Sequence, residues 1–265
     1  MIRHHGRTAG VLCAGLLVLA LAACSPPDGA SHPPGGPGTA APPSATSTPG
    51  TSPVTPTTTP PTNDPEAALR TRLADALRAE DPISAGFVAN PTTGLDAVPT
   101  AWLPGWQVVD VNVLSMPHPH RFFVGLSEAG RARDLSGHPE AFDAMVTDAR
   151  IRVGQARTAV AVGQAFLDTT RTFQRYSTRV EDLRRVGWVT DLSPAEQGAR
   201  DRVLQAYDDQ VGPPRAAPAG DGWTLTAWTV DGPTLVRHDL TVAATGTVTD
   251  RPEVVARDLP VPESV

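Results

Sequence analysis

The sequence predicts an α+β domain in which helices pack on one face of an antiparallel sheet. Two features of the 265-residue chain lead to this prediction. The C-terminal part contains three strand-like segments, 223–230, 234–242 and 247–255, which are separated by the hairpin signals Asp231-Gly232 and Thr245-Gly246. The part before them carries helical spacing of apolar residues, at 65–80, 139–146 and 156–173.

The first predicted helix spans residues 65–80. Asp64 suits its N-cap and Pro65 suits its first turn, and leucines at every fourth position then share one face. Pro82 is expected to end this helix. Residues 83–104 are rich in Gly, Pro and Thr and are expected to form an irregular connection.

Three short strands are predicted next, at 106–114, 121–126 and 131–135. In the first of them Val109 lies on one face and Asp110 on the other, as strand alternation requires. This part of the sheet therefore has one apolar face and one face with polar positions.

A further helix begins at Ser193-Pro194-Ala195-Glu196, which has the capping-box spacing of Ser and Glu and a Pro in the first turn. In the strand that follows at 234–242, His238 shares a face with apolar neighbours, so we expect a buried, hydrogen-bonded histidine. Pro252 lacks an N–H and places the last strand at a sheet edge.

The order of a helix followed by about three strands occurs twice, at 65–135 and at 193–257. By this order the domain is similar to the cystatin-like and NTF2-like arrangements, in which a helix packs against a curved sheet. We expect a single globular domain from 64 to 265, or two small halves at about 64–137 and 138–265.

The N-terminus has the features of an export signal: Arg3 and Arg7, an uncharged stretch at 8–23, and the small residues of Leu21-Ala22-Ala23-Cys24. This pattern resembles the lipobox of bacterial lipoproteins. The resemblance implies cleavage after residue 23 and attachment of a diacylglycerol to Cys24, which would anchor the protein at the outer face of the cytoplasmic membrane. The uncharged stretch would span roughly 24 Å as a helix, which is short of the ~30 Å bilayer core and disfavours a transmembrane anchor.

Residues 24–63 consist of Cys24 and a linker rich in Pro, Thr, Ser and Gly. Such a composition cannot bury enough apolar surface to fold, so we expect it to be disordered. A linker of this length would span about 35 Å as a flexible coil and about 120 Å as an extended polyproline chain.

The composition disfavours nucleic acid as a partner and a disulfide as a covalent link. The chain has 28 acidic residues and 22 basic residues, a formal net charge of −6, whereas nucleic-acid binding normally requires a basic face. Its two cysteines are Cys13, in the leader, and Cys24. A disulfide within the mature chain is therefore not expected, and the expected cofactor is none beyond the covalent diacylglycerol.

Two sets of residues are candidate binding groups. Trp102 and Trp106 flank Pro104-Gly105 and are expected to form an exposed aromatic pair for a ligand. His118 and His120 lie two apart, so both imidazoles would face a metal if the segment is extended.

That metal site would need a third ligand, for which Asp110, His138 and Glu140 are candidates. The alternative is a proline-rich turn with exposed histidines.

The chain has no Gly-rich phosphate loop and no CxxC, HExxH or EF-hand pattern. The segment 125–129 departs from the serine-hydrolase elbow at Ala129, where that motif has Gly. We therefore expect a non-catalytic domain of the cell envelope that binds a partner protein, a wall polymer or a small molecule.

Two alternatives stay open. One is an envelope hydrolase whose site assembles from residues distant in sequence, and the other is a structural or assembly lipoprotein. An enzyme would bring two or more titratable groups with shifted pKa values into one cavity, whereas a mainly apolar cavity favours binding.

Overall fold

The structure, a computed structural model, describes residues 64–114, 120–173 and 176–262. These residues belong to one compact unit. The lipobox residues and the linker lie outside the described residues, so the expectations for Cys24 and for residues 1–63 stay predictions. No helix in the described part of the chain is long and apolar enough to cross a membrane.

The first sheet is antiparallel and is built from four strands in sequence order. Its strands are β1 (Gly94–Val98), β2 (Trp106–Val113), β3 (His120–Ser127) and β4 (Ala132–Asp134). Because side chains alternate along a strand, β2 and β3 present two different faces. The face with Val109, Val111 and Val124 packs against the first two helices, α1 (Pro65–Leu77) and α2 (Pro82–Ala89).

The second sheet is also antiparallel, and three of its strands form the predicted C-terminal meander. Its strands are β5 (Ser177–Arg179), β6 (Ala217–Ala219), β7 (Gly222–Asp231), β8 (Thr234–Val242) and β9 (Val248–Ala256). The order is β5-β7-β8-β9, and β6 pairs with β7. The prediction that Pro252 lies on an edge strand is confirmed, since β9 ends this order. One face of the sheet packs against η1 (Leu183–Arg185) and α5 (Pro194–Tyr207), with Trp228 in that core.

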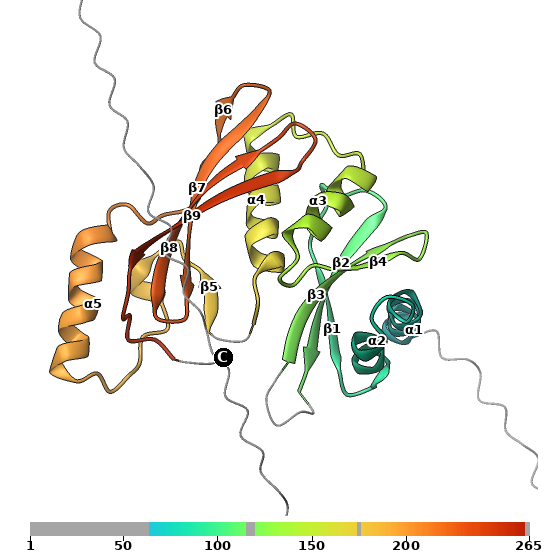
Figure 1. The fold of residues 1–265 in the computed structure, drawn as a ribbon, viewed down its shortest axis with the longest axis horizontal. Coiled ribbons are helices and arrows are strands. Elements are labelled where there is room, and N and C mark those ends of the chain that lie inside the picture. The colour runs from blue at the N-terminus through green and yellow to red at the C-terminus, as the bar shows by residue number, and fades with distance from the viewer. Residues whose placement is uncertain (1–63, 115–119, 174–175, 263–265) are drawn as a thin grey trace, which may run out of the picture. The chain divides into compact units, whose positions relative to one another are not determined.

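Two helices lie between the two sheets (Figure 1). They are α3 (Pro139–Asp148) and α4 (Ala156–Thr170). Their core contains Phe142 and Phe166, whose rings meet edge to face at 5.4 Å, together with Phe123 of the first sheet and Leu225 and Leu240 of the second. One continuous core therefore joins the part at 64–137 to the part at 138–265.

The α+β class with antiparallel sheet is confirmed. Helices cover both faces of the first sheet, however, where the sequence predicted one face. The reason is that each of the two helix–strand segments forms its own sheet, and α3 and α4 fill the space between them.

The prediction of an irregular connection at 83–104 is wrong, because this segment contains α2 and β1. Asp81 caps α2 by accepting hydrogen bonds from the backbone N–H groups of Ile83 and Ser84, at 3.1 and 3.0 Å. Pro82 therefore begins α2 in addition to following α1. Pro65 begins α1 in the same way, directly after the capping residue Asp64. The capping box at Ser193 and Glu196 is present as predicted.

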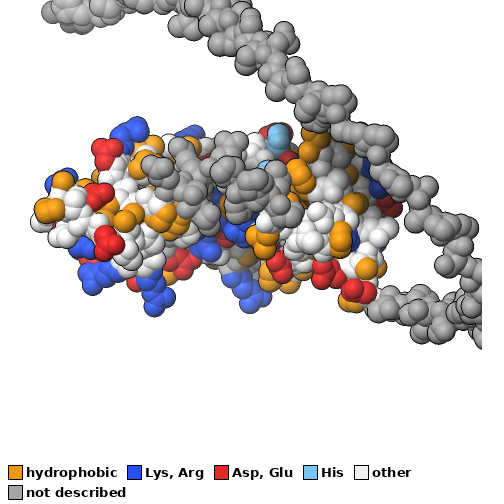
Figure 2. All heavy atoms as spheres, turned by 90° about the horizontal axis from the view of Figure 1, so that it is seen from below, with side chains coloured by type: hydrophobic (Ala, Val, Ile, Leu, Met, Phe, Trp, Pro, Cys, Tyr) orange, Lys and Arg blue, Asp and Glu red, His pale blue; other side chains and the backbone are white. Residues whose placement is uncertain are grey.

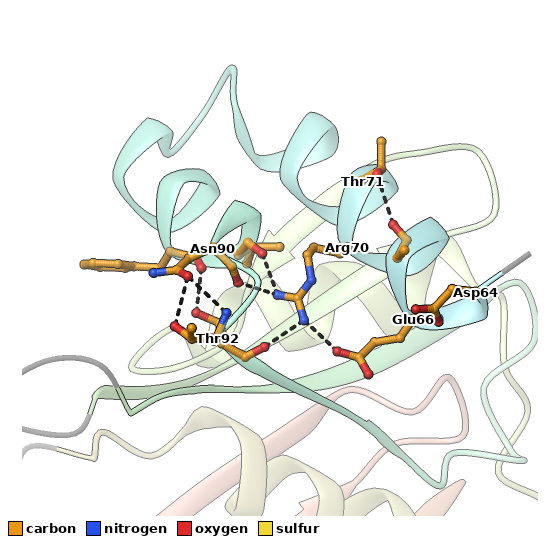
Figure 3. Close-up of polar contacts among 10 residues, drawn as sticks. Asp64, Glu66, Arg70, Thr71, Asn90 and Thr92 are labelled. Atoms are coloured by element: carbon orange, nitrogen blue, oxygen red, sulfur yellow. Dashed lines mark hydrogen bonds and ion pairs between the residues drawn. The ribbon is translucent and has the colours of Figure 1, made fainter. Parts of the chain in front are cut away.

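Arg70 holds the end of α2 against α1 (Figure 3). Its guanidinium donates to the backbone oxygens of Val88, Asn90 and Thr93 at 2.9, 2.7 and 2.8 Å, and to the Glu66 carboxylate at 2.6 Å. A helix end leaves backbone carbonyls without intrahelical partners, so this arginine supplies the missing donors.

Acidic and basic side chains are interspersed over the face of the molecule shown in Figure 2. Such a surface is typical of a domain whose charges are solvated. The expectation that nucleic acid is not a partner stays a prediction.

The cap of α2 gives a prediction for stability against pH. Hydrogen bonds from Ser84, and a weaker one from Ile83, hold the pKa of Asp81 below its ordinary value. A folded-state pKa below that of the unfolded chain contributes stability above the unfolded-state pKa, and this stability is lost as pH falls through the folded-state pKa. Asp81→Ala should lower the free energy of unfolding by about 1 kcal/mol at pH 7. The difference from wild type should shrink below about pH 4.

Urea unfolding followed by tryptophan fluorescence measures this difference. The control is Asp75→Ala, which removes an exposed α1 carboxylate paired with Arg78 and should change stability by less than about 0.5 kcal/mol. Equal losses in both variants, or a loss that persists at low pH, would contradict the capping role.

Candidate functional site

Two cavities flank the C-terminal turn of α4. The larger, here called the α4–β9 cavity, has a volume of about 710 Å³. It is lined by Pro139, Phe166, Leu167, Thr170, Arg171, Ser177, Thr229, Asp231, Val236, His238, Val248, Thr249, Asp250, Pro252 and Val254. The other, the α4–β2 cavity, has a volume of about 590 Å³, and Arg171 lines both.

The lining of the α4–β9 cavity follows from strand alternation. His238 pairs across the sheet with Ala227 of β7 and with Pro252 of β9. Thr229 and Asp250 lie two residues from those partners, so both point to the same face as His238 and sit diagonally beside it. Three neighbouring strands thus bring three polar side chains together on a mostly apolar face.

These three side chains form a hydrogen-bonded chain. The distance from Thr229 Oγ1 to His238 Nε2 is 2.9 Å, and from His238 Nδ1 to Asp250 Oδ2 it is 2.8 Å. Thr229 is buried, and the His238 and Asp250 side chains are 12% and 20% exposed. His238 is hydrogen-bonded as expected, but its side chain is partly buried and not fully buried.

The order hydroxyl, imidazole, carboxylate is that of a nucleophile, a base and the group that orients the base. With Nδ1–H donating to Asp250, the Nε2 atom of a neutral imidazole is left to accept the Thr229 hydroxyl proton. The same geometry also satisfies three polar groups inside a core, which is the commoner role of such a network.

Arg171 is the C-cap residue of α4 and lines both cavities. Its Nε and Nη1 atoms are buried and make no hydrogen bond within the described part of the chain. Its guanidinium lies 5.0 Å from the ring centre of Phe173. Burial lowers the pKa of Arg171 from its ordinary value, and the neighbouring Arg121 and Arg179 add to this while Asp168 opposes it.

The α4–β2 cavity is lined by arginines that already have carboxylate partners. Arg121 binds Asp110 through two nitrogens, Nε to Oδ1 at 2.9 Å and Nη2 to Oδ2 at 2.5 Å. This pairing with Asp110 raises the pKa of Arg121. Arg179 lies 3.4 Å from Asp168 and also contacts Glu181.

The groups with shifted pKa that line these cavities are Arg121 and Arg171, and an arginine stays cationic at neutral pH. Asp134 and Asp143, whose pKa values are raised by burial, are not among the lining residues. The cavities therefore do not gather two shifted proton donors or acceptors, and the larger one is mostly apolar.

The predicted aromatic pair is not an exposed pair. Trp102 is partly buried and lines the α4–β2 cavity. Trp106 is 8% exposed and belongs to the central core, with Arg131 over its ring at 5.5 Å. The expectation of exposure is wrong for Trp106 because helices cover both faces of the first sheet. Ligand binding by either tryptophan stays a prediction.

The predicted metal ligands are only partly described. His118 lies outside the described residues. His120 is exposed at the start of β3, near the rings of Phe87 and Phe122 at 5.6 and 5.3 Å. Among the residues that the structure describes, no three His, Cys, Asp or Glu side chains are grouped as metal ligands.

The candidate third ligands of the metal site have other partners. Asp110 is bound by Arg121, and His138 Nδ1 lies 3.1 Å from a Glu140 oxygen. The metal site stays a prediction without support from the described geometry.

No sequence pattern predicts Arg171, Thr229 or Asp250 as functional residues. The alternation of side chains in β8 predicts which face of the sheet His238 lies on. Its hydrogen-bond partners, however, are set by the pairing register of β7, β8 and β9. Arg171 follows the last helical residue, where no sequence pattern marks a binding residue.

Comparison of the chain with known proteins finds no matching protein-family model, no matching curated protein and no matching solved structure.

Proposed function

We propose that this chain is a lipid-anchored domain of the cell envelope that binds a small amphipathic molecule in the α4–β9 cavity. The observation that carries the proposal is the cavity itself. Its volume of about 710 Å³ falls within the roughly 300–1,000 Å³ of small-molecule sites. Binding sites of this kind are mainly apolar with a few placed polar groups, and this lining has that composition.

The apolar part of the lining comes from α4 and from β9. Phe166 and Leu167 face it from the helix, and Val248, Pro252 and Val254 face it from the edge strand. Val254 is 42% exposed, so the cavity is open to solvent on the side of β9. A ligand would enter there and remove this apolar surface from water.

The binding proposal is tested with an apolar fluorescent probe, N-phenyl-1-naphthylamine. The protein is the mature chain, residues 24–265, made without the leader and with Cys24→Ser so that detergent is not needed. The probe should bind one site and brighten. Val254→Trp, which places an indole at the cavity opening, should weaken its affinity by about tenfold or more.

The matched control is Val189→Trp, because Val189 is also exposed, at 37%, and does not line either cavity. It should leave the affinity unchanged. Absence of probe binding to the parent chain, or equal binding by both tryptophan variants, would refute the proposed site.

The anchoring part of the proposal rests on Leu21-Ala22-Ala23-Cys24. Cys24→Ser in the full precursor should move the protein from the membrane fraction to the soluble fraction and remove label after growth with a radioactive fatty acid, since stable anchoring needs acyl chains. Cys13→Ser, within the leader, should do neither. A Cys24→Ser protein that stays with the membrane would show that something else holds it.

A second candidate function is an envelope hydrolase, and the Thr229–His238–Asp250 chain is the observation that favours it. Thr229 Oγ1 would attack the carbonyl carbon of an ester while its proton passes to His238 Nε2. His238 would then protonate the departing alcohol, and water would release the acid from the acylated Thr229. Arg171 lies in the same lining and would stabilise the oxyanion.

Hydrolysis of p-nitrophenyl butyrate separates this candidate from pure binding. If the chain is catalytic, Thr229→Val should lower kcat/KM by at least about a hundredfold. Thr226→Val is the control, because Thr226 lies on the opposite face of β7 and contacts Asp239 at 3.2 Å. Equal rates in the two variants would leave the hydrogen-bonded chain as a structural network.

A further inference from the structure

We infer that the ligand of the α4–β9 cavity carries an anionic group, which the guanidinium of Arg171 binds. This inference rests on the proposed function and adds the chemical class of the ligand. The anionic group is an oxyanion, such as a carboxylate, sulfonate or phosphate, attached to an apolar body.

The main argument is the unmatched donors of Arg171. Arg133 and Arg237 also have a buried Nε without a partner, but each of them forms ion pairs through its other nitrogens. Arg171 has two such nitrogens and forms no ion pair with any described residue. Leaving buried donors of a charged group unpaired is costly, and an oxyanion bound at one edge of the guanidinium would satisfy one of them together with Nη2.

The carboxylates near Arg171 are already engaged. Asp168 pairs with Arg179, Asp110 pairs with Arg121, and Asp250 pairs with His238. Asp231, which also lines the cavity, has an interaction of its own. Arg171 is therefore the cation of this region that is left to bind a group from outside the chain.

The guanidinium of Arg171 is also held in place. Its centre lies over the ring of Phe173, and Arg121 lies over the same ring at 4.9 Å. A cation–π contact of this kind restricts where the guanidinium lies and leaves its N–H edges free for hydrogen bonds. A positioned fork of this kind is suited to an oxyanion, which accepts two parallel hydrogen bonds.

The charges in the cavity favour one orientation of the ligand, with its anionic group at the α4 end. Asp250 has one buried oxygen, Oδ1, without a hydrogen-bond partner among the described residues, and this oxygen repels an anion. The anionic group therefore belongs at the α4 end with Arg171. The apolar body would extend toward β9, over Val248 and Val254.

The test compares two probes that differ in one group. 1-Anilinonaphthalene-8-sulfonate and N-phenyl-1-naphthylamine share the same aromatic body, and only the first has a sulfonate. Both are titrated by fluorescence into the mature chain with Cys24→Ser. Arg171→Gln should weaken binding of the sulfonate probe by about ten- to a hundredfold and leave the neutral probe within about twofold.

Arg202→Gln is the matched control, since Arg202 is an exposed arginine of α5 that lines a different hollow. It should change neither affinity. Arg171→Lys keeps the charge but loses the fork, and should bind the sulfonate probe with an affinity between those of wild type and Arg171→Gln.

A second measurement needs no variant. Decanoate should displace the neutral probe from the unsubstituted cavity at a concentration at least about tenfold lower than 1-decanol does. Equal displacement by acid and alcohol, or parallel losses of both probes in Arg171→Gln, would overturn the inference while leaving the cavity a binding site. Failure of the neutral probe to bind the parent chain would instead refute the proposed function.

Discussion

The burial of α4 between two sheets is the constraint on which the rest of the structure depends. Gly163 lets α4 approach the second sheet closely, since a Cβ there would lie 3.0 Å from Leu225 Cδ1 and 3.3 Å from Leu240 Cδ1. Both cavities are lined by the last turn of α4 and by Arg171, which follows it. Both cavities therefore lie beside the C-terminal end of α4.

Charged groups in this space are stabilised mainly by pairing. Asp110 is 8% exposed, yet the hydrogen bonds from Arg121 offset the cost of removing its charge from water. His238 offsets the burial of Asp250 in the same way. Arg171 stands out against this background, since most buried polar groups in folded proteins have partners and an unpaired one calls for a reason. A ligand that completes the set is a physical reason of that kind.

The sequence predicts correctly those features that residues close together in the chain determine. The capping box of α5, the hairpin turns of the meander and the alternation around His238 are set by neighbours in sequence, and each is present. The prediction for 83–104 is wrong because Pro82 begins a helix that Asp81 caps, in addition to following the first helix. The prediction that Trp106 is exposed is wrong for a different reason. Its burial depends on α3 and α4, which cover the second face of β2, and no pattern within 106–114 indicates this cover. The Thr229–His238–Asp250 chain depends on the pairing register of three strands and on their common cover by α4, so it is visible only in three dimensions.

The net charge of the surface and the charge of Arg171 act on an anionic ligand over different distances. The chain has a net charge of −6, so its surface as a whole repels an anionic molecule over roughly one Debye length of about 10 Å. Inside the cavity the nearest carboxylates are paired, and the field is set by the unpaired Arg171 at short range, where low polarity strengthens it. Long-range electrostatic attraction by the net charge therefore cannot be the basis of the proposed anion binding. The proposed binding would require a ligand whose apolar body gains from burial beside β9 and whose anionic group reaches Arg171. On this proposal the cavity would select amphipathic anions over free inorganic ones.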